Sequence, residues 1–216
     1  IKDKIYSIPT SSVTYECTRK IYRLLGLPVE HIFSTFTSYD LIDKTRNEKL
    51  LKELTDMNFD AIIGNPPYQV MDGGAQASAR PIYNEFVTVS EELNSDFVSI
   101  IMPSRWYAGG KNLDEFRDKM LNDTHLQELH DFLHPELLFP DTNNRGGICY
   151  FIRNKNYDNT KKLTRVVTHS DKGIISDLMR PMKIEGSEIF TRRAETSDRQ
   201  PTVLCGRVCG AVKACS

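Results

Sequence analysis

The stretch that decides the fold is Asn65-Pro66-Pro67-Tyr68, which closes the run Phe59-Asp60-Ala61-Ile62-Ile63-Gly64. An apolar run of this length, followed by glycine and a diproline, predicts a buried strand that ends abruptly. Two consecutive prolines fix φ and remove two backbone donors, so neither a helix nor a strand ladder continues through them. An amide and a phenol are therefore held on a stiff turn at the carboxyl end of a strand, where open α/β sheets bind their ligands.

The residue types in this turn suit the activation of a planar amine. The exocyclic amine of adenine is a poor nucleophile because its lone pair is delocalised into the ring. The side-chain oxygen of Asn65 and the carbonyl of Pro66 can both accept hydrogen bonds from that amine, which favours a more nucleophilic nitrogen. Tyr68 can stack on the face of the base, a contact of about 1–3 kcal/mol. The alternative for the bare tetrapeptide is a surface turn or a polyproline-type ligand, but the apolar strand before it favours a site.

Length and composition limit the size and the class of the protein. With 216 residues, 39% of them hydrophobic and 26% charged, the chain has room for one large core or for one domain with an appendage. It contains no apolar run near the roughly 20 residues of a membrane span and no targeting motif, so we expect a cytoplasmic protein without a membrane partner. Because it begins at Ile1 rather than at methionine, we interpret the chain as a piece of a longer protein.

Charge is unevenly distributed along the chain. Residues 1–152 carry 15 Lys and Arg against 22 Asp and Glu, a net −7, whereas residues 153–216 carry 13 against 7, a net +6. A basic C-terminal part on an acidic body is typical of a nucleic-acid contact, and equally of a solvated surface.

Cysteine and histidine spacings predict no metal site. Cys17 and Cys149 lie in apolar segments and are expected to be buried. Three cysteines near the C-terminus match no common zinc pattern: Cys205, Cys209 and Cys215. Three histidines lack the carboxylates that would complete a ligand set: His125, His130 and His134.

Predicted strands alternate with predicted helices over most of the chain. We expect strands at 4–8, 31–36, 59–64, 96–102, 126–132 and 147–153, and helices at 12–25, 47–55, 81–93 and 113–121. This alternation predicts a mostly parallel, doubly wound α/β sheet. The last two strands have no helix between them, so one of them is expected to be antiparallel.

Three further segments give weaker signals. Residues 69–80 are rich in Gly, Ala and Ser and are expected to form a loop beside the turn. Residues 163–169 are expected to form a strand and residues 172–179 a helix.

Over about residues 4–153, the chain resembles the catalytic domain of N6-adenine DNA methyltransferases, most closely the methylases of type II restriction-modification systems that carry their target-recognition region at the C-terminal side. The resemblance implies a Rossmann-like fold of the S-adenosylmethionine-dependent methyltransferase type, with the first strand missing and the last strand antiparallel. It also implies a partial catalytic domain at 1–157. Residues 158–216 would then form a basic extension that could be the start of a target-recognition region.

The resemblance rests on motifs in a fixed order. Asn65-Pro66-Pro67-Tyr68 matches the family's catalytic tetrapeptide, and Asn65 would also contact the methyl donor. Segment 81–86 looks like the part that packs on the cofactor's adenine through Phe86, and 97–106 is similar to the next strand and its Pro-small-aromatic end.

The resemblance implies functional roles for two more residues. Phe139, in a Leu-Leu-Phe-Pro loop before the strand at 147–152, fits the aromatic that stacks on an extruded base opposite Tyr68. Asp40 stands where the family places an acidic residue near the amine of the cofactor's adenine. The structural alternatives remain open: Phe86 as a core residue, Asp40 as a turn residue, Phe139 as a loop plug, and Trp106 and Tyr107 as packed rather than facing DNA.

The chain departs from the family at its beginning. The family opens with a strand and a glycine-rich loop that cradle the methionine part of S-adenosylmethionine, and nothing before Ile5 can form that element. The next family strand ends in an acidic residue for the ribose, and Ser7-Ile8-Pro9 supplies none. We therefore expect part of the cofactor site to be missing from these residues.

The function implied by the resemblance is methyl transfer from S-adenosylmethionine to an adenine flipped out of double-stranded DNA. The leaving group is a neutral thioether, so the reaction requires no metal. A restriction endonuclease domain or subunit would lie outside the chain. Two alternatives stay open, namely a methyltransferase that acts on a protein glutamine or on ribosomal RNA through a similar turn, and a non-catalytic DNA-binding or specificity module.

Overall fold

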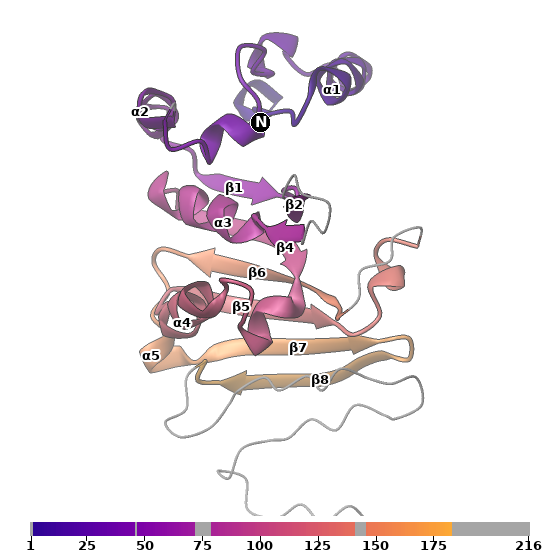
Figure 1. Ribbon diagram of the computed structural model, residues 1–216, viewed down its shortest axis with the longest axis vertical. Helices are drawn as coiled ribbons and strands as arrows, with labels where there is room; N and C mark the ends of the chain where they lie inside the picture. Colours follow the sequence, from indigo (N-terminus) through magenta and orange to yellow (C-terminus); the bar gives the residue numbers. More distant parts are fainter. Residues whose placement is uncertain (1, 46, 72–78, 141–145, 183–216) are drawn as a thin grey trace, which may run out of the picture. The chain divides into compact units, whose positions relative to one another are not determined.

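The computed structural model describes residues 2–45, 47–71, 79–140 and 146–182 (Figure 1). By their contacts they form two units, Ile1–Phe59 with Thr88–Asn94 and Asp60–Val87 with Ser95–Ser216. None of the described helices is long and apolar enough to cross a membrane.

The first unit contains two α-helices, α1 (Ser12–Leu25) and α2 (Asn47–Asp56), and the short 3-10 helices Lys2–Lys4, Val29–His31 and Ser38–Leu41. Helix α1 begins after Ser11, whose side chain accepts a hydrogen bond from the Thr14 amide, and ends at Gly26, whose φ of 65° suits glycine. Both predicted helices are confirmed.

Two predictions for the first unit are wrong. The strands expected at 4–8 and 31–36 are reduced to a single parallel bridge between Ser7 and Ile32, because only one residue of each segment pairs. Cys17 is exposed rather than buried, since it lies on the same exposed face of α1 as Val13 and Leu24.

The second unit is built on a six-stranded mixed sheet (Figure 1). Its order is β1-β4-β6-β5-β7-β8. Strand β1 is parallel to β4, and β5 to β7, whereas β6 is antiparallel to both β4 and β5, and β8 to β7. The strands are β1 (Ala61–Gly64), β4 (Phe97–Pro103), β5 (Leu126–Phe132), β6 (Ile148–Asn154), β7 (Thr164–Ser170) and β8 (Gly173–Arg180).

Four strands, β1, β4, β5 and β7, therefore run in the same direction and share a carboxyl edge. This confirms the mostly parallel sheet and the antiparallel strand among the last two expected strands. Strand β6 follows β5 in the chain but inserts between β4 and β5, so the beginning of β6 also lies at the carboxyl edge.

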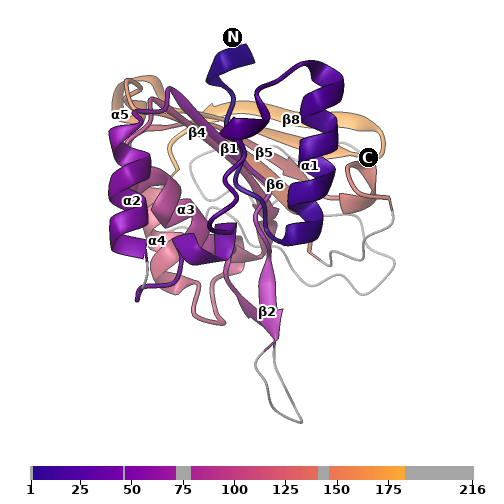
Figure 2. The same ribbon diagram turned by 90° about the horizontal axis from the view of Figure 1, so that it is seen from above.

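Helices α3 (Tyr83–Glu92) and α4 (Asp114–Asn122) lie on the same side of the strands (Figure 2). The side chains of β4 alternate between buried and more exposed positions, as expected for a strand with one face against helices. The core between the sheet and the helices joins the first turns of α3 to β4, α4, β5, β6 and β7, and includes Tyr83, Val87, Val98, Ile100, Met102, Phe116, Met120, Leu129, Phe151 and Val166.

Two segments differ from the expected structure. The ends of the predicted loop at 69–80 form an antiparallel ribbon of β2 (Gln69–Met71) and β3 (Ala79–Pro81). The helix expected at 172–179 is wrong: strand β8 occupies it. Its apolar pairs recur four residues apart and imitate a helical period. The turn signal before them decides the structure, because Gly173 adopts a φ of 100° and closes a hairpin opposite Ser170.

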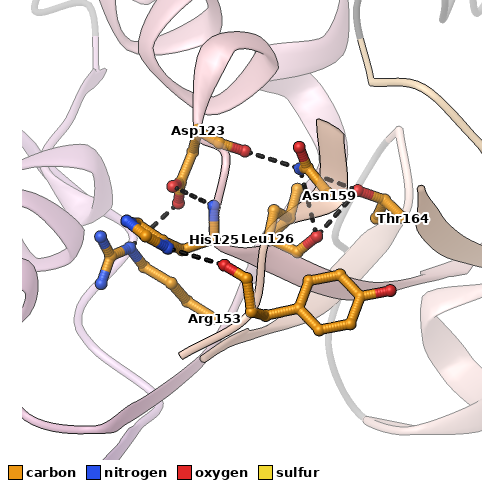
Figure 3. A network of polar contacts seen from close by, with 7 residues as sticks. Asp123, His125, Leu126, Arg153, Asn159 and Thr164 are labelled. Atoms are coloured by element: carbon orange, nitrogen blue, oxygen red, sulfur yellow. Dashed lines mark hydrogen bonds and ion pairs between the residues drawn. The ribbon is translucent and has the colours of Figure 1, made fainter. Parts of the chain in front are cut away.

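A polar network closes the opposite, amino-terminal edge of the sheet (Figure 3). The Asp123 carboxylate accepts hydrogen bonds from Arg153 Nε at 3.0 Å and from the His125 amide at 2.9 Å. The side-chain amide of Asn159 donates to the Asp123 carbonyl at 2.8 Å and to Thr164 Oγ1 at 3.1 Å. This network ties the beginning of β7 and the short helix α5 (Asn159–Lys162) to β5 and β6, across the predicted division at residue 157.

Candidate functional site

The Asn65–Tyr68 turn lies at the carboxyl edge of the sheet, directly after β1. Gly64 is the last paired residue of β1 and lies opposite Ile100 of β4. A Cβ atom at Gly64 would lie 2.9 Å from Ile100 Cδ1, so a side chain here would displace the end of the Ile100 side chain. Asn65 is exposed, and Pro66 and Pro67 are half-buried. The structure thus presents the Asn65 amide at the place that the sequence predicted.

Tyr68 connects this turn to the core. Its ring is half-buried and packs against the hydrophobic core, and its backbone carbonyl accepts a hydrogen bond from the Ile82 amide at 3.1 Å, just before α3. The Tyr68 hydroxyl is buried and has no hydrogen-bond partner within the described ranges. Burial, with a further contribution from Cys149, raises the pKa of Tyr68 to about 12. The phenol is therefore neutral at physiological pH and is held by packing.

A buried polar cluster at the same edge was missed by the sequence reasoning. Ser104, the first residue after β4, donates a hydrogen bond from Oγ to Asp131 Oδ1 at 2.8 Å, and both residues are buried. Asp131 lies opposite Cys149 in the pairing of β5 with β6. The available signal was a carboxylate two residues after Leu129, on the same face of the strand, and a carboxylate is costly to bury without a purpose.

Cys149 is fully buried within this cluster. Trp106 Nε1 donates a hydrogen bond to its Sγ at 3.4 Å. Burial raises the pKa of the Cys149 thiol to about 11, with Asp131 adding to the rise and hydrogen bonds from Trp106, Tyr107 and Ser104 opposing it. The thiol is thus protonated and unreactive at neutral pH. The expectation that Cys149 is buried is confirmed.

Two aromatic residues after β4 pack beside this buried polar cluster. Trp106 and Tyr107 lie in the 3-10 helix Ser104–Ala108, are almost fully buried, and meet edge to face with ring centroids 4.6 Å apart. Arg117 Nε donates to the Tyr107 carbonyl at 2.8 Å, which fixes this helix to α4. The packed alternative for Trp106 and Tyr107 is therefore confirmed.

The residues assigned from the resemblance lie in different surroundings. Phe86, in the first turn of α3, is only 5% exposed. Phe139 is half-buried in the segment after β5, and its amide donates to the Pro135 carbonyl at 2.9 Å. Asp40 belongs to the first unit, where its Oδ2 accepts hydrogen bonds from the Thr37 amide at 2.7 Å and the Thr37 hydroxyl at 3.0 Å. The structure brings Asn65, Tyr68, Phe86 and Phe139 into one unit, and the functional roles of all five residues stay predictions.

The histidines form local contacts. His130 lies within hydrogen-bond distance of His169, at 3.1 Å, and of Glu128, at 3.0 Å, and stacks on Tyr150 with ring centroids 4.5 Å apart. His125 bonds the Tyr157 carbonyl through Nδ1, and His134 contacts Glu136. Within the described ranges, no group of three His, Cys, Asp or Glu side chains could hold a metal ion.

Comparison with known proteins gives one family. The profile of the Eco57I restriction-modification methylases matches residues 14–139. An uncharacterized adenine-specific methylase of Mycoplasma pneumoniae is 36% identical over 104 residues, which are 47% of this chain and 25% of that protein.

Comparison with solved structures supports the fold. The type I restriction-modification methyltransferase subunit from Streptococcus thermophilus aligns with a TM-score of 0.51 and 18% identity over 81% of this chain. The chain covers 39% of that subunit and about a quarter of the Mycoplasma relative.

Proposed function

Because the chain belongs to the Eco57I restriction-modification methylase family, we propose that it transfers a methyl group from S-adenosylmethionine to the N6 amine of an adenine in DNA. The family implies an adenine methylase and a methyl donor. The identity of the donor, the DNA substrate and the flipped base are part of the proposal.

The observation that supports it is the exposed Asn65 amide on a rigid turn at the carboxyl edge of the sheet. An exocyclic amine placed there can donate one hydrogen bond to the Asn65 side-chain oxygen and another to the Pro66 carbonyl. These acceptors stabilise positive charge that develops on the nitrogen as it attacks, and the diproline holds them in place beforehand.

Tyr68 is proposed to stack on the target base. Its ring is half-buried while its hydroxyl end is anchored in the core, so part of the ring remains available for a contact. Phe139, also half-buried, is proposed to provide the second aromatic face. Two such contacts compensate for the stacking that a base loses on leaving the duplex.

Only some of the residues that the resemblance assigns to the methyl donor are free to contact a ligand. When bound, S-adenosylmethionine supplies an electrophilic methyl group on a sulfonium whose leaving group is a neutral thioether. Of the residues assigned to the donor, Asn65 is exposed and able to reach a ligand. Phe86 can offer only a small part of its ring, and Asp40 already caps a turn through one carboxylate oxygen. We therefore propose Asn65 as a donor contact, and Asp40 and Phe86 remain predictions.

The test is methyl transfer by the intact protein from isotope-labelled S-adenosylmethionine. Double-stranded DNA, ribosomal RNA and a protein extract are offered in parallel, and labelled nucleosides or amino acids are identified. The proposal predicts label in N6-methyladenine of DNA. Label in RNA or in glutamine would keep the amine chemistry but change the substrate, and DNA binding without any transfer would favour a non-catalytic specificity module.

A further inference from the structure

The buried pair of Ser104 and Asp131 lies at the same edge of the sheet as the Asn65–Tyr68 turn. Ser104 is 1% exposed and Asp131 is 5% exposed, and their hydrogen bond measures 2.8 Å. A carboxylate in the interior of a sheet is costly to desolvate even when it is hydrogen-bonded, and an apolar residue of similar size would pack there at no such cost. The pair therefore calls for a role other than stability.

The pair fixes the chain segment that follows β4. The Ser104 hydroxyl is bonded to β5 through Asp131, and the Ser104 amide donates to the Gly147 carbonyl just before β6 at 3.0 Å. Two residues later, Trp106 donates to Cys149 of β6. Through these bonds, the 3-10 helix Ser104–Ala108 is held against two strands at their ends on the carboxyl edge.

This segment belongs to the same core cluster that the ring of Tyr68 packs against. Tyr68 packs against the core cluster that contains Trp106, Tyr107 and Cys149. Cys149 is close enough to the Tyr68 phenol to interact with it electrostatically. Since the Tyr68 hydroxyl has no hydrogen-bond partner within the described ranges, its ring is held by packing against this cluster rather than by a hydrogen bond of its hydroxyl.

We propose that the hydrogen bond from Ser104 to Asp131 is a positioning element for methyl transfer. It holds the Ser104–Ala108 helix and Cys149 in place, and these in turn keep the Tyr68 ring in the orientation that stacks the target base. Ser104 and Asp131 are positioning residues that act through Tyr68. The inference rests on the proposed function, because it assigns the pair to that reaction.

The chain offers a matched control on the same strand. Ser95 lies just before β4 and Ser104 just after it, and both are buried. The Ser104 hydroxyl donates to Asp131 at 2.8 Å, and the Ser95 hydroxyl donates to the Phe97 carbonyl at 2.9 Å. Ser104→Ala and Ser95→Ala remove the same atom from opposite ends of β4. Both variants of the intact protein are assayed with labelled S-adenosylmethionine and DNA, well below their melting temperatures.

The expected result is a kcat about tenfold lower for Ser104→Ala and near the wild-type value for Ser95→Ala, since small misplacements of a reacting base are costly. Donor binding, measured by calorimetry, should stay within about twofold of wild type in both variants. Asp131→Asn keeps an acceptor for Ser104 and should lose less rate than Asp131→Leu. The double variant Ser104→Ala with Asp131→Asn should lose about as much as Ser104→Ala alone, because the two residues act as one unit.

Equal rate losses in Ser104→Ala and Ser95→Ala, or losses that multiply in the double variant, would overturn the inference while leaving the proposed function intact. A wild-type rate in Ser104→Ala would do the same. Absence of methyl transfer by the wild-type protein would overturn both, since the pair would then have no reaction to position.

Discussion

The Asn65–Tyr68 turn at the carboxyl edge of the six-stranded sheet and the polar network at its amino edge treat their polar groups in opposite ways. At the amino edge, Asp123, Arg153 and Asn159 are joined by hydrogen bonds and an ion pair (Figure 3). At the carboxyl edge, the Asn65 amide is exposed and the Tyr68 hydroxyl is buried without a partner within the described ranges. Satisfied polar groups stabilise a fold, whereas groups left ready to bond are typical of a place where a ligand binds. The comparison therefore indicates a stabilising role for the amino edge and is consistent with the proposed site at the carboxyl edge.

Asn65→Ala should have the largest effect on the reaction. It removes an acceptor that the proposed mechanism needs, and losing one such preorganised group lowers kcat by about 100-fold or more. Because Asn65 is exposed, the melting temperature should change little. Asn65→Asp keeps oxygen acceptors and should retain measurable transfer. A near-wild-type rate in Asn65→Ala, measured with labelled donor, would remove Asn65 from the mechanism.

Asn159→Ala is the counterpart at the amino edge. It leaves the Asp123 carbonyl and Thr164 Oγ1 without the donor they share, and should lower the free energy of unfolding by about 1–3 kcal/mol. The melting temperature should fall by roughly 3–10 °C, while kcat below the transition stays near wild type. The exposed neighbour variant Asn156→Ala serves as the control for thermal melting. A loss of rate without a loss of stability would break the division between the two edges.

Tyr68 combines packing and proposed stacking, so two substitutions separate them. Tyr68→Ala removes the ring and should lower kcat/KM for DNA by about 10- to 100-fold, corresponding to roughly 1–3 kcal/mol of stacking. Tyr68→Phe removes only a hydroxyl that has no partner within the described ranges, and should change kcat/KM by less than about twofold. If Tyr68→Phe lost as much as Tyr68→Ala, the hydroxyl would have to form a bond in the reacting complex.

At the carboxyl edge, the end of β1 was predicted correctly, but its burial was not: β1 was expected to be buried, and Ile63 is 83% exposed. The two consecutive prolines after Asn65 permit few conformations, so the end of β1 and the place of Asn65 could be deduced from the residues. The alternation of strands and helices likewise predicted the parallel strands and an antiparallel strand among the last two. Structure could therefore be predicted from the sequence wherever the signal lies within a few neighbouring residues.

The features that the sequence did not reveal depend on contacts between distant residues. Ser104 and Asp131 are 27 residues apart, and no sequence pattern near either residue predicts their hydrogen bond. Strand β8 was mistaken for a helix because its apolar period was ambiguous and only pairing with β7 resolves it. Cys17 was expected to be buried because its helix has an apolar face, but amphipathicity alone does not show which face of a helix is covered.

Acidification should have the smallest effect, and it should act on the pair of histidines near the carboxyl ends of β5 and β7. Burial, with His130 adding to it and Asp131 opposing it, lowers the pKa of His169 below its ordinary value. Since the folded state disfavours the charged form, the stability that this group contributes is present above about pH 6.5 and is lost as the pH falls through the lowered pKa. The other charged groups around the pair are Glu128, Arg165 and Asp177, of which Arg165 holds the pKa of Asp177 below its usual range.

The measurement is thermal melting of wild type and His169→Gln between about pH 7.5 and about pH 5.5, where histidine is the side chain that ordinarily titrates. The amide of glutamine can still donate to His130 but does not titrate, so the variant should lose less stability on acidification than wild type. Groups that titrate elsewhere in the chain affect both proteins alike and cancel in the comparison. Hydrogen exchange should show the wild-type loss first in the amides of β7 near His169 and last near Thr164, at the amino edge. Equal losses in both proteins would mean that the histidine pair does not couple protonation to the pairing of β5 with β7.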